Sequence, residues 1–212
     1  MRLPRVILAD DHTLVAEALH QLIAPHFDVV ATVADGRALL DFTKSLKPDV
    51  VVVDIAMPLL NGLEAVRHLK REMPGVKVVF LTMNEDPEVA LEAMNSGASG
   101  YVLKKSAATE LLQTIQAALH GKSYVTPRIA QGIQDLFIRN PQGRSHYKAL
   151  TPRQREVAQL LAEGKSMKEA ADILRVTPRT IAFHKYRIMQ NHGLKTNADF
   201  IQFAIKNRIV MR

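Results

Sequence analysis

The first 120 or so residues alternate strictly between short β-rich apolar runs and longer stretches in which apolar residues recur at helical spacing. Five runs predict strands, at 5–9, 29–33, 50–53, 76–82 and 100–103. The run 50–53 is apolar throughout, which is typical of a parallel strand buried on both faces. A chain that alternates in this way is predicted to form an α/β domain, a doubly wound (βα)5 parallel sheet with helices on both faces.

The last third of the chain has a different pattern, helical throughout. Thr151-Pro152 and Thr177-Pro178 each combine a capping residue with a proline suited to a first helical turn. Two short helices joined by a tight turn, the second rich in basic residues, predict a helix-turn-helix, and Asp199 to Lys206 predicts a fourth helix. We therefore expect domains at 1–124 and 150–212, with a linker at 125–149 that contains one helix and ends in a breaker-rich stretch at 140–145.

The charge of the chain is divided between these two parts. Residues 1–124 hold 12 Lys and Arg against 15 Asp and Glu, a net of −3, whereas residues 125–212 hold 16 against 6, a net of +10. A basic C-terminal part indicates a polyanionic partner. The chain has no cysteine, and no apolar run approaches the ~20 residues that cross a bilayer. We expect a cytoplasmic protein without a membrane partner.

Polar side chains gather where the predicted strands end. Asp10 and Asp11 follow the first strand, Asp54 the third, Thr82 the fourth and Lys104 the fifth. The carboxyl ends of parallel strands meet at one edge, which is where doubly wound sheets bind ligands. Clustered carboxylates favour a shared cation, and this oxygen-rich set suits Mg²⁺. A carboxylate beside Mg²⁺ can attack phosphorus, while a lysine and a hydroxyl hold the phosphoryl oxygens.

The motifs in these segments resemble those of receiver domains, and the whole chain resembles NarL/FixJ-type response regulators from about residue 4 to 210. The matching segments are Ile7 to His12, Asp54 to Gly62, Leu81-Thr82 and Gly100 to Lys104. The resemblance implies a flavodoxin-like receiver fold and phosphorylation of Asp54 by a histidine kinase. It also implies Mg²⁺ bound by Asp10, Asp11, Asp54 and the backbone carbonyl of Ala56, and a phosphoryl-binding and switch set of Thr82, Tyr101 and Lys104.

The C-terminal motifs resemble the LuxR-type DNA-binding domain over residues 149–210. By this resemblance, phosphate contacts are expected from Lys165, Ser166, Thr177, Thr180, Lys185 and Arg187, and base contacts from Arg179, Phe183 and His184. Ala182, Tyr186 and Arg175 depart from the usual pattern, and Arg175 replaces a turn glycine, where a positive φ would be mildly strained. These departures predict an unusual DNA target or weaker base contacts.

The sequence thus predicts a phosphorylation-controlled transcription regulator, not an enzyme with an external substrate. Two alternatives remain: a signalling adaptor whose helix-turn-helix has lost specific DNA binding, and a small doubly wound enzyme. The second is disfavoured because Asp10-Asp11-His12 stands where a glycine-rich phosphate loop would follow the first strand.

Coupling between the two parts is expected to use a two-state element. We expect the acidic and basic parts to attract each other before phosphorylation. Thr82 would then move toward the phosphoryl group as Tyr101 turns inward. An apolar stripe of Leu112, Ile115 and Leu119 is predicted to become a pairing surface, giving a homodimer upon phosphorylation.

Overall fold

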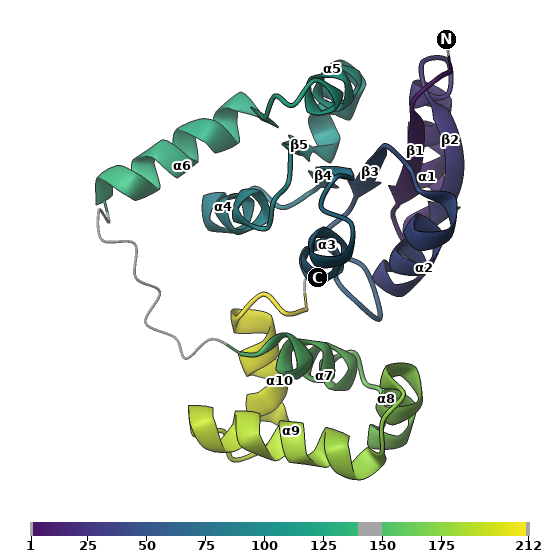
Figure 1. Ribbon diagram of the computed structural model, residues 1–212. Helices are drawn as coiled ribbons and strands as arrows, with labels where there is room; N and C mark the ends of the chain where they lie inside the picture. The colour runs from purple at the N-terminus through teal and green to yellow at the C-terminus, as the bar shows by residue number, and fades with distance from the viewer. Residues whose placement is uncertain (1, 140–149, 211–212) are drawn as a thin grey trace.

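The computed structural model describes residues 2–139 and 150–210, which form a layered α/β unit and a helical unit (Figure 1). The strands are β1 (Arg5–Ala9), β2 (Asp28–Val33), β3 (Val50–Val53), β4 (Lys77–Thr82), β5 (Gly100–Leu103) and β6 (Tyr124–Val125). The helices of this unit are α1 (Thr13–Ile23), α2 (Gly36–Leu46), α3 (Gly62–Glu72), α4 (Pro87–Asn95), α5 (Ala107–Leu119) and α6 (Pro127–Arg139), with a short 3₁₀ turn at Lys104–Ser106.

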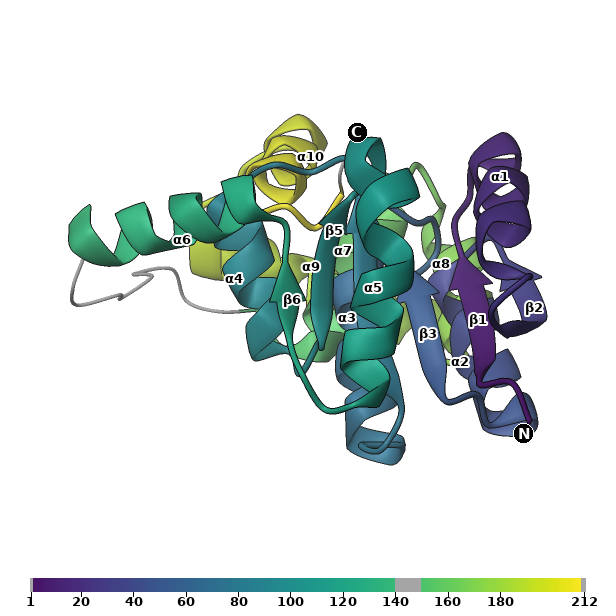
Figure 2. The same ribbon diagram turned by 90° about the horizontal axis from the view of Figure 1, so that it is seen from above.

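The sheet is parallel with the strand order β2-β1-β3-β4-β5-β6, which confirms the predicted doubly wound architecture. Helices cover both faces (Figure 2). One core lies between the sheet and α2, α3 and α4, and the other between the sheet and α1 and α5. The order of strands reverses between β1 and β3, so the carboxyl ends of these two strands border the crevice where a ligand site is expected.

The segment after α5, which was predicted to be the start of a linker, packs against the sheet unit. β6 pairs with β5, and α6 packs on α4 with Ile129 buried in the core. The apolar stripe predicted on α5 is not a free surface. Ile115 is fully buried, and Leu112 and Leu119 pack against the core beneath the helix. That prediction was wrong because the stripe faces the sheet of its own domain.

The helical unit contains α7 (Pro152–Ala162), α8 (Met167–Leu174), α9 (Pro178–His192) and α10 (Asn197–Lys206). Side chains of Thr151, Ser166, Thr177 and Thr196 cap the four helices, each accepting a bond from a backbone N–H in the first turn. Arg175 ends α8 with φ of +52°, as expected from its place in the turn. Of the linker predicted at 125–149, residues 140–149 lie outside the described residues.

The two units contact each other through α7 and the chain end on one side and α3, α4 and the β3–α3 loop on the other (Figure 1). Ion pairs join the two units across this contact, and the basic partner lies in the helical unit in some of them and in the sheet unit in others. Arg155 and Arg208 face acidic residues of the sheet unit, as the charge division predicts, but Arg37 and His68 instead bind Glu156 of α7. Helix α9 lies on the far side of the helical unit, away from the sheet.

None of the helices in the part of the chain that the structure describes is long and apolar enough to cross a membrane.

Candidate functional site

The carboxylates predicted to cluster do lie together at the carboxyl ends of β1 and β3. Ligand atoms of Asp10, Asp11, His12 and Asp54 all fall within 4.8 Å of one another. The side chains of Asp10 and Asp54 are nearly buried, with 4% of each exposed, whereas Asp11 lies at the rim. The structure therefore holds two desolvated carboxylates beside a third that remains open to water.

Lys104 neutralises part of this charge from the end of β5. Its Nζ lies 2.7 Å from Asp54 Oδ2 and 2.8 Å from Asp10 Oδ2, so one ammonium joins both buried carboxylates. Burial alone would lower the pKa of Lys104, but the hydrogen bonds to Asp10 and Asp54 outweigh it, and the pKa is raised. Lys104 is thus held as a cation at the place where a transferred phosphoryl group would bring negative charge.

The backbone of the β3–α3 loop completes the site. The amide N–H of Ile55 donates to Asp54 Oδ1 at 2.7 Å, and that of Ala56 approaches the same oxygen at 3.4 Å. Gly62 is required here, since a Cβ at this position would lie 2.1 Å from the backbone oxygen of Asp54. The loop is therefore packed tightly against the residue that carries the candidate nucleophile.

Thr82 and Tyr101 are linked through a residue that the sequence analysis did not single out, Asn84. The backbone N–H of Asn84 donates to Thr82 Oγ1 at 3.2 Å, and its carbonyl accepts from the Tyr101 hydroxyl at 2.8 Å. Tyr101 is fully buried, and burial, followed by the charges of Asp86 and Asp54, raises its pKa. The tyrosine points inward in this conformation, so the predicted inward turn requires a second, outward position of the ring and stays a prediction.

The predicted DNA-contact residues lie on α9 and at the start of α8. Thr177 caps α9 by accepting from the backbone N–H of Thr180 at 3.2 Å, and the two hydroxyls lie 3.0 Å apart. Ser166 caps α8 in a reciprocal arrangement with Glu169, and Lys165 immediately precedes it. These N-terminal turns present backbone N–H groups and hydroxyls, which suit phosphate oxygens.

Only part of the predicted base-contact set is fully exposed on α9. Arg179, Phe183 and Arg187 are exposed, and the guanidinium of Arg187 lies 5.5 Å from the centre of the Phe183 ring. His184 is only partly exposed, and its pKa is lowered by burial and by nearby Arg153. Lys185 is also partly buried and donates to Asn197 Oδ1 at 2.7 Å.

Tyr186 is the candidate that the sequence analysis missed on this helix. It is 65% exposed and lies one turn from Phe183 on the same face. The spacing of three residues from Phe183 was a usable signal, although the sequence analysis treated Tyr186 only as a departure from the pattern.

Comparison with known proteins agrees with this geometry in both units. Residues 6–116 match the family model of the response regulator receiver domain, and residues 148–204 match that of the bacterial regulatory proteins of the luxR family. The chain belongs to the response regulators. It is 30% identical to the response regulator GacA of Pseudomonas aeruginosa over 97% of both chains. It is 31% identical to the oxygen regulatory protein NreC of Staphylococcus aureus, over 97% of this chain and 99% of that one.

A solved complex of the response regulator RcsB with DNA contains a chain that resembles the protein described here along nearly its whole length. The TM-score is 0.60 with 26% identity, over 95% of this chain and 98% of that one. The likeness thus extends across both units and is not confined to the receiver domain.

The acidic pocket of this response regulator fits a divalent cation. Three carboxylates carry −3 and Lys104 carries +1, which leaves −2 within a few ångströms. The donors are hard carboxylate oxygens, which Mg²⁺ prefers as ligands. Two of the three carboxylates, those of Asp10 and Asp54, are nearly buried. His12 adds an imidazole, but its side chain is 62% exposed and its Nδ1 lies 2.9 Å from Asp11 Oδ1.

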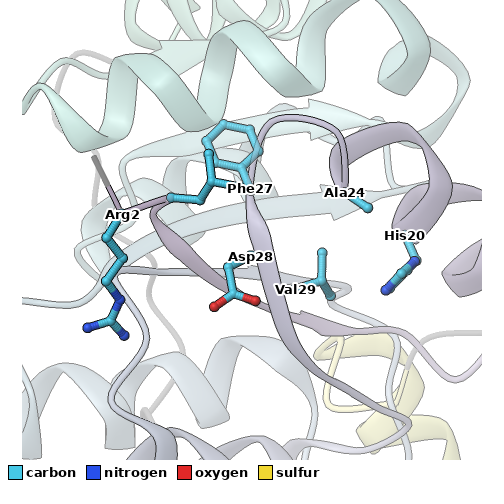
Figure 3. Close-up of a pocket in the computed structure, with 7 residues that line it drawn as sticks. Arg2, His20, Ala24, Phe27, Asp28 and Val29 are labelled. Atoms are coloured by element: carbon cyan, nitrogen blue, oxygen red, sulfur yellow. The ribbon is translucent and has the colours of Figure 1, made fainter.

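A hollow separate from the acidic pocket lies at the amino-terminal end of the strands. Its volume is about 480 Å³, and Arg2, His20 and Asp28 lie around it near the start of β2 (Figure 3). Its polar groups are spread along the rim and point in different directions. It takes no part in the acidic pocket.

Proposed function

We propose that this response regulator accepts a phosphoryl group on Asp54 and binds DNA through α9. The observation that carries the first half is the arrangement of Asp54, which shares one lysine with Asp10 while its second oxygen faces backbone N–H groups. One carboxylate oxygen of Asp54 would attack the phosphorus of a phosphohistidine on a partner kinase. The bond from phosphorus to the imidazole breaks, and an acyl phosphate forms.

The other residues of the pocket have distinct roles in this proposal. Asp10, Asp11, Asp54 and the carbonyl of Ala56 would hold Mg²⁺, which supplies neutralising charge to the phosphoryl oxygens. Lys104 would pair with a phosphoryl oxygen, and the Thr82 hydroxyl would donate to another. The phosphoryl group is lost by hydrolysis, so the chain acts on itself and no external substrate is turned over.

The test is intact-mass measurement of the full chain incubated with acetyl phosphate and Mg²⁺. We expect the mass of one phosphoryl group on the wild type and none on Asp54→Asn. Equal labelling of the two proteins would overturn the assignment.

DNA binding rests on the exposure of α9. The receiver domain does not cover the helix, and Arg179, Phe183, Tyr186 and Arg187 face solvent along it. The RcsB–DNA complex supports the same role for this domain. Selection from a random-sequence DNA pool, followed by affinity measurement across salt concentrations, tests this half. A protein that neutralises Z phosphates gives a log–log slope of about −0.9Z, whereas the adaptor alternative predicts no selected sequence.

We also propose that phosphorylation favours a homodimer, because the two α9 helices of a dimer would match the two halves of a roughly palindromic DNA site. The stripe on α5 is not available for this, but α10 leaves Ile201 and Ile205 about one-third exposed, at 36% and 37%. Sedimentation with and without beryllofluoride tests the dimer. An unchanged mass in beryllofluoride would contradict it.

A further inference from the structure

The outer face of α9 carries two large aromatic side chains. Ile181 and Ile188 on the inner face are fully buried, so the rotation of the helix is fixed. Phe183 is 56% exposed and Tyr186 is 65% exposed, and their spacing of three residues makes them neighbours on the helix surface. In the part of the chain that the structure describes, neither ring packs into a hydrophobic core. Their apolar surface is therefore open to a partner.

These rings belong to a longer stripe along the helix. The outer stripe of α9 consists of residues that recur at helical spacing: Arg179, Ala182, Phe183, Tyr186, Arg187 and Gln190. Ala182 is partly exposed and the others are fully exposed. Ala182 and Phe183 have no polar side-chain atom, and Tyr186 has only the hydroxyl at the end of its ring. The middle of the outer stripe is therefore apolar.

The cations of α9 lie around this apolar middle. Arg179 stands in the first turn, and the guanidinium of Arg187 lies 5.5 Å from the centre of the Phe183 ring, within the range of a cation–π contact. Lys185 is partly buried and donates to Asn197 Oδ1 at 2.7 Å. Such a surface suits a polyanion that has apolar groups between its charges.

The major groove of duplex DNA offers one apolar group, the C5 methyl of thymine. Guanine presents two acceptors there, and adenine presents an acceptor and a donor, so recognition of either base requires polar side-chain atoms. Ala182 and Phe183 have none, but alanine and phenylalanine are side chains that contact the thymine methyl. The departures at Ala182 and Tyr186 therefore favour an unusual DNA target over a loss of base contacts.

We propose that the outer stripe of α9 recognises thymine in duplex DNA through its methyl group. The inference rests on the proposed binding of DNA by α9. Phe183 is the main contact, with Ala182 and Tyr186 beside it, while Arg179 and Arg187 pair with phosphates or guanines that flank the thymines. An α-helix fits the major groove, where the methyl groups are exposed. The target is thus rich in thymine at the positions that face the middle of α9.

The test compares thymine with uracil, because the two bases differ only in the methyl group. The wild type selects a sequence from a random duplex pool, and each thymine of that duplex is then replaced in turn by deoxyuridine. Affinities are measured by fluorescence anisotropy with the full chain, Mg²⁺ and acetyl phosphate at one salt concentration. Burial of one methyl group contributes ~0.8 kcal/mol, so binding should weaken about fourfold at the contacted positions.

Variants assign this preference to a side chain. Phe183→Ala should bind the thymine and uracil duplexes alike, and α9 is retained because Phe183 is exposed and alanine is a good helix former. Phe183→Leu retains apolar surface and should keep most of the preference. Gln190→Ala is the matched control, since it truncates an exposed polar residue of the same stripe, and its ratio of thymine to uracil affinity should equal that of the wild type.

Equal affinity of the wild type for thymine and uracil at every position would overturn methyl recognition and leave DNA binding by α9 intact. A thymine preference that survives in Phe183→Ala would overturn the role of Phe183. Loss of the preference in Phe183→Leu, with tighter binding of the wild type to single-stranded DNA, would replace methyl recognition by stacking of the ring on unpaired bases. A wild type that selects no sequence would overturn the proposed DNA binding and this inference with it.

Discussion

Replacement of Lys104 by methionine tests the electrostatics of the acidic pocket. The change retains the length of the side chain but removes the ammonium that lies 2.7 and 2.8 Å from Asp54 and Asp10. Removal of one partner from a buried ion pair costs about 3–5 kcal/mol. Asp11 at the rim is 32% exposed and admits some water, so we expect about 3 kcal/mol at neutral pH without Mg²⁺.

The pH dependence of this loss follows from the groups involved. The folded-state pKa of Lys104 is raised, so its contribution is fully present below about 10.5 and is lost only as the pH rises through the folded-state value.

Urea unfolding measures this directly across pH, with and without millimolar Mg²⁺. Mg²⁺ should also reduce the loss, because it supplies the missing positive charge. Lys105→Met is the control, since Lys105 is exposed and pairs with Glu85, and an ion pair in contact with water contributes little to stability. A loss in Lys104→Met that is the same at every pH and Mg²⁺ concentration would refute the electrostatic reasoning.

Three further outcomes are expected. Gly62→Ala should lower the stability of the receiver domain by at least about 2 kcal/mol in thermal unfolding, because the added Cβ meets the backbone of Asp54; an unchanged Tm would contradict the tight loop packing. Thr177→Ala should cost the C-terminal domain about 1 kcal/mol in denaturant unfolding through loss of the α9 cap, and no change would contradict the capping role. Tyr186→Ala should weaken binding to selected DNA in fluorescence anisotropy more than Gln190→Ala does, and equal effects would remove Tyr186 from the DNA contacts.

The fold was predictable from the sequence because its periodicities are long and regular. The one strand that was missed, β6, has two residues, too few to show a period, and it forms because β5 offers an open edge. The stripe on α5 was predicted correctly as apolar but assigned to the wrong partner. A helix buries the same pattern against its own sheet or against a second chain, and a single sequence does not distinguish the two.

The acidic pocket was predictable for a different reason. The topology of a parallel sheet brings its strand ends together, so Asp10, Asp54 and Lys104 had to meet once the strands were placed. The interdomain contacts were not predictable. Gln159 and Asn61 are 98 positions apart, and their hydrogen bond depends on how the two domains dock, for which neither local pattern carries a signal.

The central claim is that phosphorylation of Asp54 controls DNA binding, and the most direct measurement is DNA affinity before and after phosphorylation. A DNA sequence selected by the wild-type protein is titrated with wild type and Asp54→Asn, each with Mg²⁺, in the presence and absence of acetyl phosphate. We expect acetyl phosphate to increase the affinity of the wild type and to leave that of Asp54→Asn unchanged. Equal affinity of the wild type in both conditions, with phosphorylation confirmed by mass, would contradict the account.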